Sequence, residues 1–528
     1  MKRLLLLLTV AATLSAAELY RVAGVLVDSE TGSPIANASL ALSPGGESRG
    51  ELVTSAGSDG RFGFDAPRGK FTLSAVVAGR SEKFGLTSPF AGMGCAVITG
   101  PDQDTAHLVF RWYRPVVIAG RVLDDQGEPV ERARVQLLYS GVVGGRSRIT
   151  PLTDAWTDDR GDYRIWWVSG ATYYLVVTAQ PWYGNNGLAR LGQTQAPVAY
   201  ATVYYPGTTD IARAAPLTVP SGGEAHADFT LTAVAAATIT VNCDNDAAGE
   251  ASATQRRGGM TARVIAEGIG GTETVVSQPP VFRCPFTVNG VLPGRYLLRL
   301  SNTGTANPLV AQQWIDVGAG DMAVSLSLHP PASVRGNVTL KSGGARPGGT
   351  LVVHLSREAG NTSVSMAVGT DGGFSVPRIE PGKYRVFVSG AGYYAETIRA
   401  GDTALPDGVV NIEDGVESRL NIVASNESGR LKGYATRDDQ PVANMLVVLV
   451  PRDPASGYPN QPFQTDSDGS FDWPPTRAGD YLLFAVDDPT VAWADPQTVR
   501  PYLSQAKSIR IEPGKVTEER VPVQAAAR

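Results

Sequence analysis

The sequence predicts an all-β protein, built as a tandem array of about five Greek-key β-sandwich domains, and three observations lead to this prediction. First, one pattern recurs with a period of about 100 residues, which is the size of an independent domain. Second, the strands alternate apolar and polar residues with a period of two, as in 134–137 and 383–388. Third, the 528 residues include 59 glycines and 36 prolines, which is typical of turns between many strands.

The recurring pattern has four parts: a first strand that contains a glycine, a turn of the Gly-x-Pro type, an Asp-x-x-Gly-aromatic turn, and a turn of the Gly-x-Tyr type before an apolar strand. The clearest copies lie at 119–122, 127–130 and 158–163, and at 432–434, 440–442, 466–471 and 478–481. In Asp-Gly turns glycine supplies a positive φ, and aspartate bonds the backbone. We therefore interpret the repeated residues as scaffold, with the aromatic residue after each turn pointing into the core.

We expect a signal peptide at 1–17, followed by five β-sandwiches at 18–114, 115–233, 234–330, 331–427 and 428–528, called domains 1 to 5 below. Lys2 and Arg3 precede an apolar run and the small residues Ser15, Ala16 and Ala17, a pattern typical of cleaved export signals. No second long apolar segment follows, so we expect no transmembrane segment in the mature chain and a periplasmic or extracellular location. Closing and opening strands nearly touch at the junctions, which predicts a stiff rod or a compact arc.

Composition argues against several function classes. Charged residues make up 18% of the chain with a net charge of −5, so we expect no nucleic-acid partner. The four histidines are scattered and no metal-binding spacing occurs, so we expect no metal and no cofactor. Serine motifs at 46–50 and 504–507 lack the context that catalysis requires. The turn at 466–469 begins like a calcium loop, but a hairpin turn explains it better. We expect no enzyme activity.

The combination of glycine opener, Gly-x-Pro-Val, Asp-x-x-Gly-aromatic and Gly-x-Tyr resembles the carboxypeptidase regulatory-like domain. The match is best in domains 2 and 5, and in domain 5 it runs from Gly433 through Pro451 to Ala485. The resemblance implies a transthyretin-like, Ig-like sandwich, also classed with carbohydrate-binding-like folds, in a secreted bacterial protein. It implies no peptidase activity, because the catalytic domain that this module accompanies in metallocarboxypeptidases has no counterpart in the sequence.

Three cysteines occur in a chain expected to reach an oxidising compartment. Cys243 ends the first strand of domain 3, and Cys284 lies where the other repeats place the Asp-x-x-Gly turn. We expect a disulfide between them, which closes a loop of about 40 residues and stabilises by about 3–4 kcal/mol in the chain-entropy model. Cys95 is left over, and a buried free thiol is the simpler interpretation of it.

Domain 2 differs from the others by an aromatic-rich insertion at 179–220. Aromatic side chains that combine an apolar ring with a polar tip can contact sugars. The candidate ligand-binding residues are Trp166, Trp167, Trp182, Tyr183, Tyr204 and Tyr205. Because Trp166 and Trp167 are consecutive on a strand, we expect one of them on the outer face or under the insertion. The alternative is that the insertion folds over this face and buries the rings in a satellite core.

Two functions remain open at this point. The first is an exported, non-catalytic multidomain binding protein whose partner is a carbohydrate or another cell-surface polymer. The second is a structural spacer or assembly protein that acts through contacts with a cell-surface protein. An exposed aromatic row in domain 2 would favour the first, whereas free sheet edges or flat apolar patches would favour the second.

Overall fold

The protein is described by a computed structural model that covers residues 18–526, except 46–49, 86–94, 182–196, 245–259, 282–283, 303–307, 344–350, 359–361, 391, 454–459 and 489. The expected signal peptide at 1–17 therefore lies outside the described residues. The described residues form 45 strands, one α-helix, α1 (Pro496–Leu503), and two short 3-10 helices, η2 (Ile211–Arg213) and η4 (Ile269–Gly271). The predicted all-β fold class, a tandem array of β-sandwiches, is confirmed.

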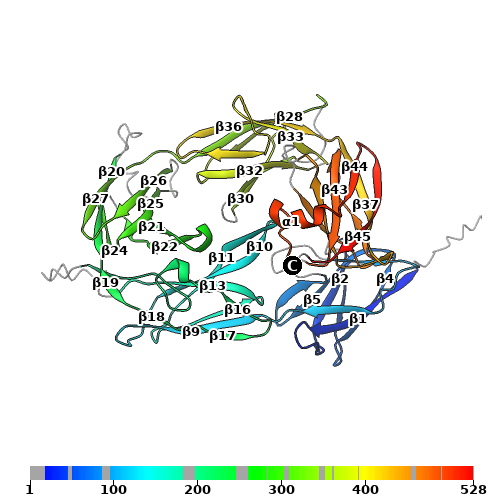
Figure 1. Cartoon of the computed structure of the whole chain (residues 1–528), viewed down its shortest axis with the longest axis horizontal. Coiled ribbons are helices and arrows are strands. Elements are labelled where there is room, and N and C mark those ends of the chain that lie inside the picture. The colour runs from blue at the N-terminus through cyan, green and yellow to red at the C-terminus, as the bar shows by residue number, and fades with distance from the viewer. Residues whose placement is uncertain are drawn as a thin grey trace, which may run out of the picture.

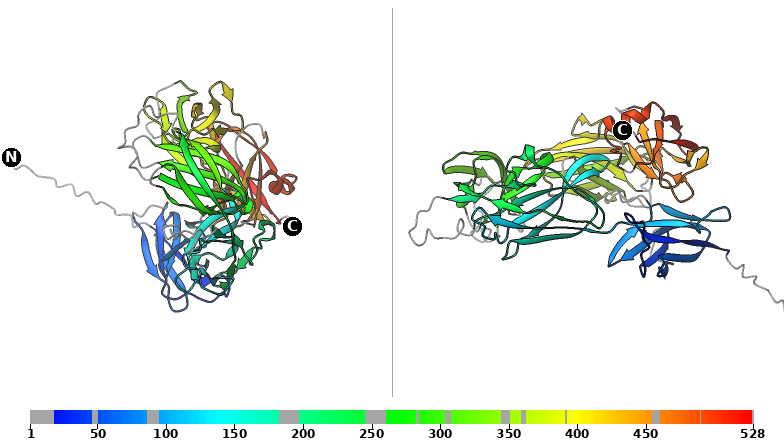
Figure 2. Two further views of the ribbon diagram at one scale, coloured as in Figure 1. Left: turned by 90° about the vertical axis from the view of Figure 1, so that its left-hand side faces the viewer. Right: turned by 60° about the horizontal axis from the view of Figure 1, so that its bottom comes forward.

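The five sandwiches follow one another around a closed ring (Figure 1), in which domain 5 returns to lie against domain 1. In the tilted view of Figure 2, domain 1 lies directly below domain 5. The expected compact arc therefore closes on itself, and the rod is not observed. Within the described residues, no helix has the length and apolar character needed to cross a membrane.

Domains 1 and 2 each contain two main sheets, and a small third sheet joins the insertion of domain 2 to the strand that leads into domain 3. The strands of domain 1 are β1 (Leu19–Asp28), β2 (Ser39–Pro44), β3 (Leu52–Ser55), β4 (Arg61–Pro67), β5 (Gly69–Val77), β6 (Arg80–Lys83), β7 (Ala96–Thr99) and β8 (Leu108–Trp112). Those of domain 2 and its exit are β9 (Val116–Asp124), β10 (Arg134–Val143), β11 (Arg146–Trp156), β12 (Asp162–Val168), β13 (Ala171–Thr178), β14 (Val198–Tyr200), β15 (Val203–Tyr204), β16 (Leu217–Val219), β17 (Glu224–His226), β18 (Phe229–Leu231) and β19 (Ala233–Ala235).

Domains 3 and 4 repeat the arrangement of two facing sheets. The strands of domain 3 are β20 (Ala237–Asp244), β21 (Met260–Glu267), β22 (Glu273–Ser277), β23 (Pro280–Val281), β24 (Phe286–Val291), β25 (Gly294–Asn302), β26 (Leu309–Val317) and β27 (Met322–Ser327). Those of domain 4 are β28 (Ser333–Leu340), β29 (Val352–Arg357), β30 (Ser363–Ala367), β31 (Gly373–Val376), β32 (Gly382–Ser389), β33 (Tyr394–Ala400), β34 (Thr403–Ala404), β35 (Val409–Ile412) and β36 (Glu417–Ser425).

In domain 5 the two sheets are joined through a strand that pairs with both. Its strands are β37 (Ser428–Arg437), β38 (Gln440–Pro441), β39 (Leu446–Pro451), β40 (Gln461–Gln464), β41 (Ser470–Asp472), β42 (Thr476–Arg477), β43 (Gly479–Val486), β44 (Lys507–Ile511) and β45 (Val516–Gln524). Each of the five ranges expected from the sequence contains a buried apolar cluster of its own. We therefore propose to keep these ranges as the domain division.

One strand order recurs in all five domains. The first strand lies antiparallel to a strand near the middle of the domain, which follows the glycine turn in every domain except domain 3, and parallel to a strand near the end of the domain, called the closing strand. The antiparallel pairs are β1–β4, β9–β12, β20–β24, β28–β31 and β37–β41, and the parallel pairs are β1–β8, β9–β18, β20–β27, β28–β36 and β37–β45. Each domain thus joins its own beginning to its own end.

The glycine of the first strand is required by this arrangement in four domains. In each, the glycine lies opposite the aromatic residue of the following turn, in the pairs Gly24–Phe62, Gly120–Tyr163, Gly336–Phe374 and Gly433–Phe471. A Cβ atom on Gly433 would lie 1.8 Å from the Glu519 carbonyl oxygen of the closing strand and 2.8 Å from the Phe471 ring. Because glycine has no side chain, the aromatic ring can lie on the first strand while the closing strand approaches the same position.

Domain 3 lacks this glycine–aromatic pair and has a disulfide instead. Ile239 and Val288 are cross-strand partners on β20 and β24, and Cys243 is bonded to Cys284, 41 positions later in sequence, with a Cα–Cα distance of 5.8 Å. Cys243 and Cys284 also pack against the buried cluster of domain 3. The covalent link therefore joins β20 to the chain just before β24, where the other domains use an Asp-Gly turn.

We predict that Gly433→Ala destabilises domain 5 by about 1–3 kcal/mol, because the added methyl group overlaps a backbone carbonyl that cannot move without distorting the parallel pair. Hydrogen exchange of the β37 and β45 amides in the full chain measures this loss. Gly318→Ala is the control, since no atom lies within 4 Å of a Cβ built there. Equal protection of β37 in the two variants would contradict the packing role of Gly433.

Candidate functional site: the contact that closes the ring

The aromatic candidates whose side chains the structure describes do not gather on one surface. Trp166 lies on β12, where Trp166 and Trp167 face a single residue of β9 in a β-bulge, and its side chain is 64% exposed. Tyr204 lies on β15 in the opposite sheet and is buried with Leu138, Val176 and Ile269. This cluster joins domain 2 to η4 of domain 3.

The remaining aromatic candidates give a mixed picture. Tyr205 is partly buried against the main core of domain 2. The side chain of Trp167 is not among those described, and Trp182 and Tyr183 lie outside the described residues. Of the three candidates with described side chains, only Trp166 is largely exposed, so Trp166 alone keeps the expected geometry of a ligand contact.

The chemistry of the described side chains does not indicate a catalytic centre. No group of three or more His, Cys, Asp or Glu side chains that could hold a metal ion occurs in the described part of the chain. The calcium alternative at 466–469 has a different explanation, because Asp466 is occupied by a contact with domain 1. This contact joins the first and the last domain through polar groups and is the candidate functional site.

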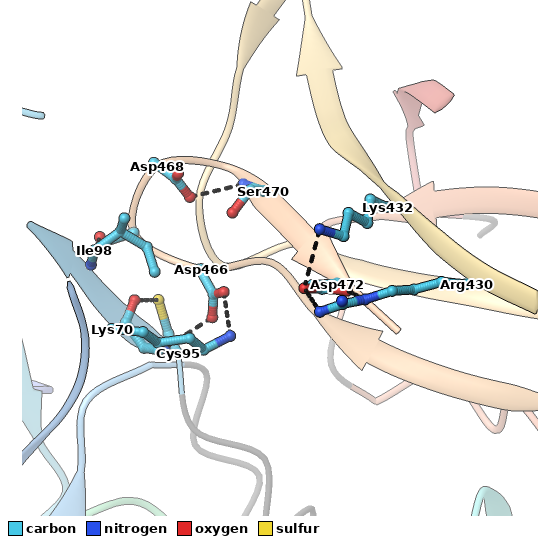
Figure 3. Close-up of polar contacts among 11 residues, drawn as sticks. Lys70, Cys95, Ile98, Arg430, Lys432, Asp466, Asp468, Ser470 and Asp472 are labelled. Carbon is cyan, nitrogen blue, oxygen red and sulfur yellow. Dashed lines mark hydrogen bonds and ion pairs between the residues drawn. The ribbon is translucent and has the colours of Figure 1, made fainter. Parts of the chain in front are cut away.

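The turn between β40 and β41 of domain 5 docks on the free edge of β7 in domain 1 (Figure 3). The Asp466 carboxylate accepts hydrogen bonds from Lys70 Nζ at 2.6 Å and from the Ala96 amide at 3.1 Å. The Ser467 amide donates to the Ala96 carbonyl at 2.9 Å, and the Ile98 amide donates to Ser467 Oγ at 2.9 Å. Asp466 and Ser467 thus satisfy the backbone groups of β7 that an added strand would otherwise bond.

Asp466 is not needed for the turn in which it lies. The same backbone hydrogen bonds form in domains 1 and 4, where glycine occupies this position as Gly57 and Gly369. In domain 2 the equivalent Asp158 bonds the amides of its own turn. In domain 5 that task falls to Asp468, which accepts from the Ser470 amide at 3.0 Å. The carboxylate of Asp466 is therefore available for domain 1.

Burial of Asp466 gives the contact an electrostatic cost. The residue is 4% exposed, and burial raises the pKa of its carboxyl group above the usual value of 3.8, a rise that Asp468 adds to and that Lys70 and the Ala96 amide oppose. Lys70 is half exposed and also lies over the Phe463 ring, 5.9 Å from its centre. An open pocket of about 230 Å³ lies at the seam and is lined by Lys70, Phe463, Asp466 and neighbouring residues.

Cys95 precedes β7 and is part of the same contact region. It is a free cysteine, 2% exposed, and its Sγ lies 3.6 Å from the Ala96 carbonyl oxygen. Burial and the neighbouring Asp466 and Asp468 carboxylates raise the pKa of the thiol well above its usual range. The thiol is therefore neutral at physiological pH, which makes it a packing residue and not a nucleophile.

A second contact reaches domain 5 from across the ring. The hairpin formed by β10 and β11 extends from domain 2 towards α1 (Figure 1). At its tip, the Gly145 carbonyl accepts from the Ala494 amide at 2.7 Å, and the Trp493 ring lies so close that a Cβ atom on Gly145 would be 2.5 Å from it. On the side of the hairpin, Ile149 packs against Gly270 of domain 3. One hairpin thus ties domain 2 to domains 3 and 5.

Direct contacts also fix the junctions between consecutive domains. Arg80 of domain 1 donates to Ser169 Oγ of domain 2 at 2.7 Å, and Gln180 Nε2 donates to the Val276 carbonyl of domain 3 at 3.2 Å. Arg299 and Glu380 form an ion pair at 3.6 Å between domains 3 and 4. The Arg477 guanidinium lies 5.6 Å from the centre of the Tyr394 ring, between domains 4 and 5.

Comparison with known proteins does not assign the chain to a family. No protein-family model matches it, so the resemblance to the carboxypeptidase regulatory-like domain stays a prediction, and no curated protein matches either. Among solved structures, a streptococcal ancillary pilin is 12% identical, with 54% of this chain and 98% of that chain covered and a TM-score of 0.18.

Two further solved structures show a similar degree of likeness. The minor pilin GBS52 of Streptococcus agalactiae is 16% identical, with 41% and 96% of the two chains covered and a TM-score of 0.20. Two B repeats of the collagen binding protein of Staphylococcus aureus are 11% identical, with 78% and 100% covered and a TM-score of 0.13. Likeness of this extent supports no conclusion about activity or partners.

We predict that the contact between domains 1 and 5 is strongest below pH 3.8, the usual pKa of an exposed aspartate, and weakens as the pH rises through the higher pKa of Asp466 in the closed contact. The pKa of Asp466 is higher in the closed contact than in an exposed carboxyl group, so closing takes up a proton and is favoured at low pH. Hydrogen exchange of the Ala96 and Ile98 amides, corrected for intrinsic rates, measures the opening. Lys70 and Asp468 are the other titratable groups that shift the pKa of this carboxyl group, and Asp466 in turn raises the pKa of the Cys95 thiol.

Asp466→Asn should flatten this pH dependence, because the amide keeps the shape and does not titrate. The Leu26 amide, which donates to the Gly60 carbonyl within domain 1, is the internal control and should not follow the trend. Protection of Ala96 that rises with pH, or the same trend in Asp466→Asn, would contradict the assignment to Asp466.

Proposed function

We propose that this chain is an exported, non-catalytic binding protein that acts through protein–protein contacts as a stiff, ring-shaped assembly subunit. The observation that carries the proposal is the closure of the ring, in which the first and last domains bond one another and the β10–β11 hairpin reaches across to domain 5. A flexible chain of sandwiches would lose conformational freedom on binding. A closed ring presents its surfaces at set positions and avoids part of that cost.

Exposed apolar side chains on sheet strands support binding of a protein partner. Val53 on the edge strand β3 is 65% exposed, Val516 on β45 is 53% exposed, and Trp314 on β26 is 48% exposed. Apolar side chains on accessible strands are typical of surfaces that meet another chain. They lie in domains 1, 5 and 3, so a partner would contact several parts of the ring.

The test is cross-linking in the cells that produce the protein, with a tag after residue 528. The tagged chain should be found in the periplasmic or extracellular fraction. A membrane-impermeant amine cross-linker should join it to another protein, and Asp466→Ala/Ser467→Ala should weaken that adduct by opening the ring. Gly318→Ala is the matched control. A cytoplasmic location, or an adduct of the same yield in the ring-opening variant, would contradict the proposal.

A second candidate function, carbohydrate binding, is favoured by the exposed ring of Trp166. Its sheet presents Trp166 beside an ion pair at 3.7 Å between Arg164 on β12 and Glu224 on β17, the strands on either side of β9. An apolar ring with charged hydrogen-bonding groups nearby suits a sugar ring with its hydroxyl groups. Trp182 and Tyr183 of the insertion remain proposed members of this site.

We predict that Trp166→Ala weakens binding to a polysaccharide by about threefold to tenfold, which corresponds to about 0.5–1.5 kcal/mol for one aromatic contact. Affinity electrophoresis of the mature chain against a polysaccharide panel measures the change, and Trp182→Ala tests the insertion in the same gels. Trp314→Ala is the control. That ring is also about half exposed, but the Arg295 guanidinium lies over it, 5.2 Å from the ring centre. The sugar site is wrong if no polysaccharide binds, or if all three variants bind as the unmodified chain does.

A further inference from the structure

Domain 5 is attached covalently to the rest of the chain only through its junction with domain 4. Its described contacts with domain 1 are the hydrogen bonds and the ion pair made by Asp466 and Ser467, and the approach of Lys70 to the Phe463 ring. Its contact with domain 2 is the packing of Trp493 on Gly145 and one backbone hydrogen bond beside it. Every contact of domain 5 with the first half of the ring can therefore separate and form again without chemistry.

The junction between domains 4 and 5 is short enough to act as a hinge. β36 ends at Ser425 and β37 begins at Ser428, so Asn426 and Glu427 alone connect them. Glu427 is held in its present geometry by Lys341 Nζ at 2.9 Å and by the Ala478 amide, which donates to its carbonyl at 3.1 Å. A connection of this length can fold domain 5 back on its own ring or extend it away, and short hinges favour exchange between chains.

We propose that domain 5 exchanges between two copies of this chain. Domain 5 of one copy docks on the β7 edge and the β10–β11 hairpin of the second copy, and the second copy does the same in return. The result is a two-fold symmetric dimer with two complete docking sites, each made by residues of both copies. The docking contacts are the same as in the ring and only the hinge differs, so the balance between ring and dimer depends on the hinge and on concentration.

The chemistry of the docking surfaces fits a contact that opens and closes in solution. Asp466, Ser467 and Lys70 are polar, and half of the Lys70 side chain is already in water. Water can solvate these groups when domain 5 moves away, whereas a large apolar surface would aggregate. The buried carboxylate also keeps the net gain from the ion pair small, because desolvation offsets much of the attraction.

The test uses the mature chain, 18–528, prepared with ordinary and with heavy nitrogen. Equal amounts are mixed at high concentration, and monomer and dimer are separated by size exclusion. A carbodiimide then activates the Asp466 carboxyl group, and Lys70 Nζ, 2.6 Å away, attacks it to form an amide while the urea by-product leaves. Mass spectrometry of the peptide that joins positions 70 and 466 shows whether its halves came from one copy or two.

The expected result is that linked peptides from the monomer carry one label, and that about half of those from the dimer carry both. The proposal is overturned if no dimer forms at about millimolar concentration, or if the linked peptides of the dimer carry only one label. Lys70→Arg is the matched control. It keeps the cation but cannot be coupled, so the dimer should persist while the linked peptide disappears.

A hinge variant gives an independent measurement. A flexible insert of about six Gly and Ser residues between Asn426 and Glu427 lets domain 5 close easily on its own domain 1 and should shift the population towards monomer. Asp466→Ala/Ser467→Ala should reduce ring and swapped dimer together. A dimer fraction that the insert leaves unchanged would overturn the role of the hinge and with it the proposal.

Discussion

The close approach between the first and the closing strand of each domain is the constraint on which the rest of the structure depends. At Gly433 there is no room for a single methyl group between β37 and the Glu519 carbonyl. Because the two strands are parallel, the chain enters and leaves each sandwich at opposite ends of it, so that consecutive domains follow one another head to tail. A glycine without a Cβ atom at this point in four domains thus lets the two strands pair, and their parallel pairing sets the path of the chain.

In each sandwich the first strand pairs with the closing strand, and in the ring the first domain contacts the last domain. The interactions that make these two kinds of contact differ. Within a domain the join is apolar and backbone-based, with Phe471 lying on Gly433 and parallel strands hydrogen-bonded beside it. Between domains 1 and 5 the join is polar, made by Asp466 and Ser467 on the β7 edge. The apolar contact within a domain stabilises the fold of that domain, whereas the polar contact lets domains 1 and 5 separate and remain solvated.

The parts of the fold that depend on neighbouring residues could be predicted from the sequence. Asp-Gly turns, alternating strands and the aromatic residue after each turn are local signals, and the turn aspartates bond amides two residues away, as Asp468 bonds Ser470. The pairing of Cys243 with Cys284 followed from the one repeat that lacks such a turn. These features involve residues of one domain, and one domain is what a local pattern specifies.

The contacts between domains could not be predicted in the same way. Asp466 accepts a hydrogen bond from the Ala96 amide, 370 positions earlier, and nothing in the sequence of the turn motif indicates that its side chain contacts another domain. A hint exists only in comparison, because Gly57 and Gly369 occupy the same position and show that the turn needs no carboxylate there. The burial of Tyr204 could not be predicted for a similar reason. Its ring packs with Ile269 of the next domain, a neighbour that the sequence of domain 2 does not contain.

The way the ring closes limits what kind of assembly the molecule can join. A single contact between domains 1 and 5 would leave domain 5 free to swing about the turn at Asp466. The hairpin tip at Gly145 adds a second point of attachment on the far side of domain 5, beside α1. Two points and the hinge at Glu427 define the orientation of domain 5, so opening requires that the seam and the hairpin contact release together. Because each domain has a buried apolar cluster of its own, it keeps its core while the ring opens, and the change is confined to how the domains are placed.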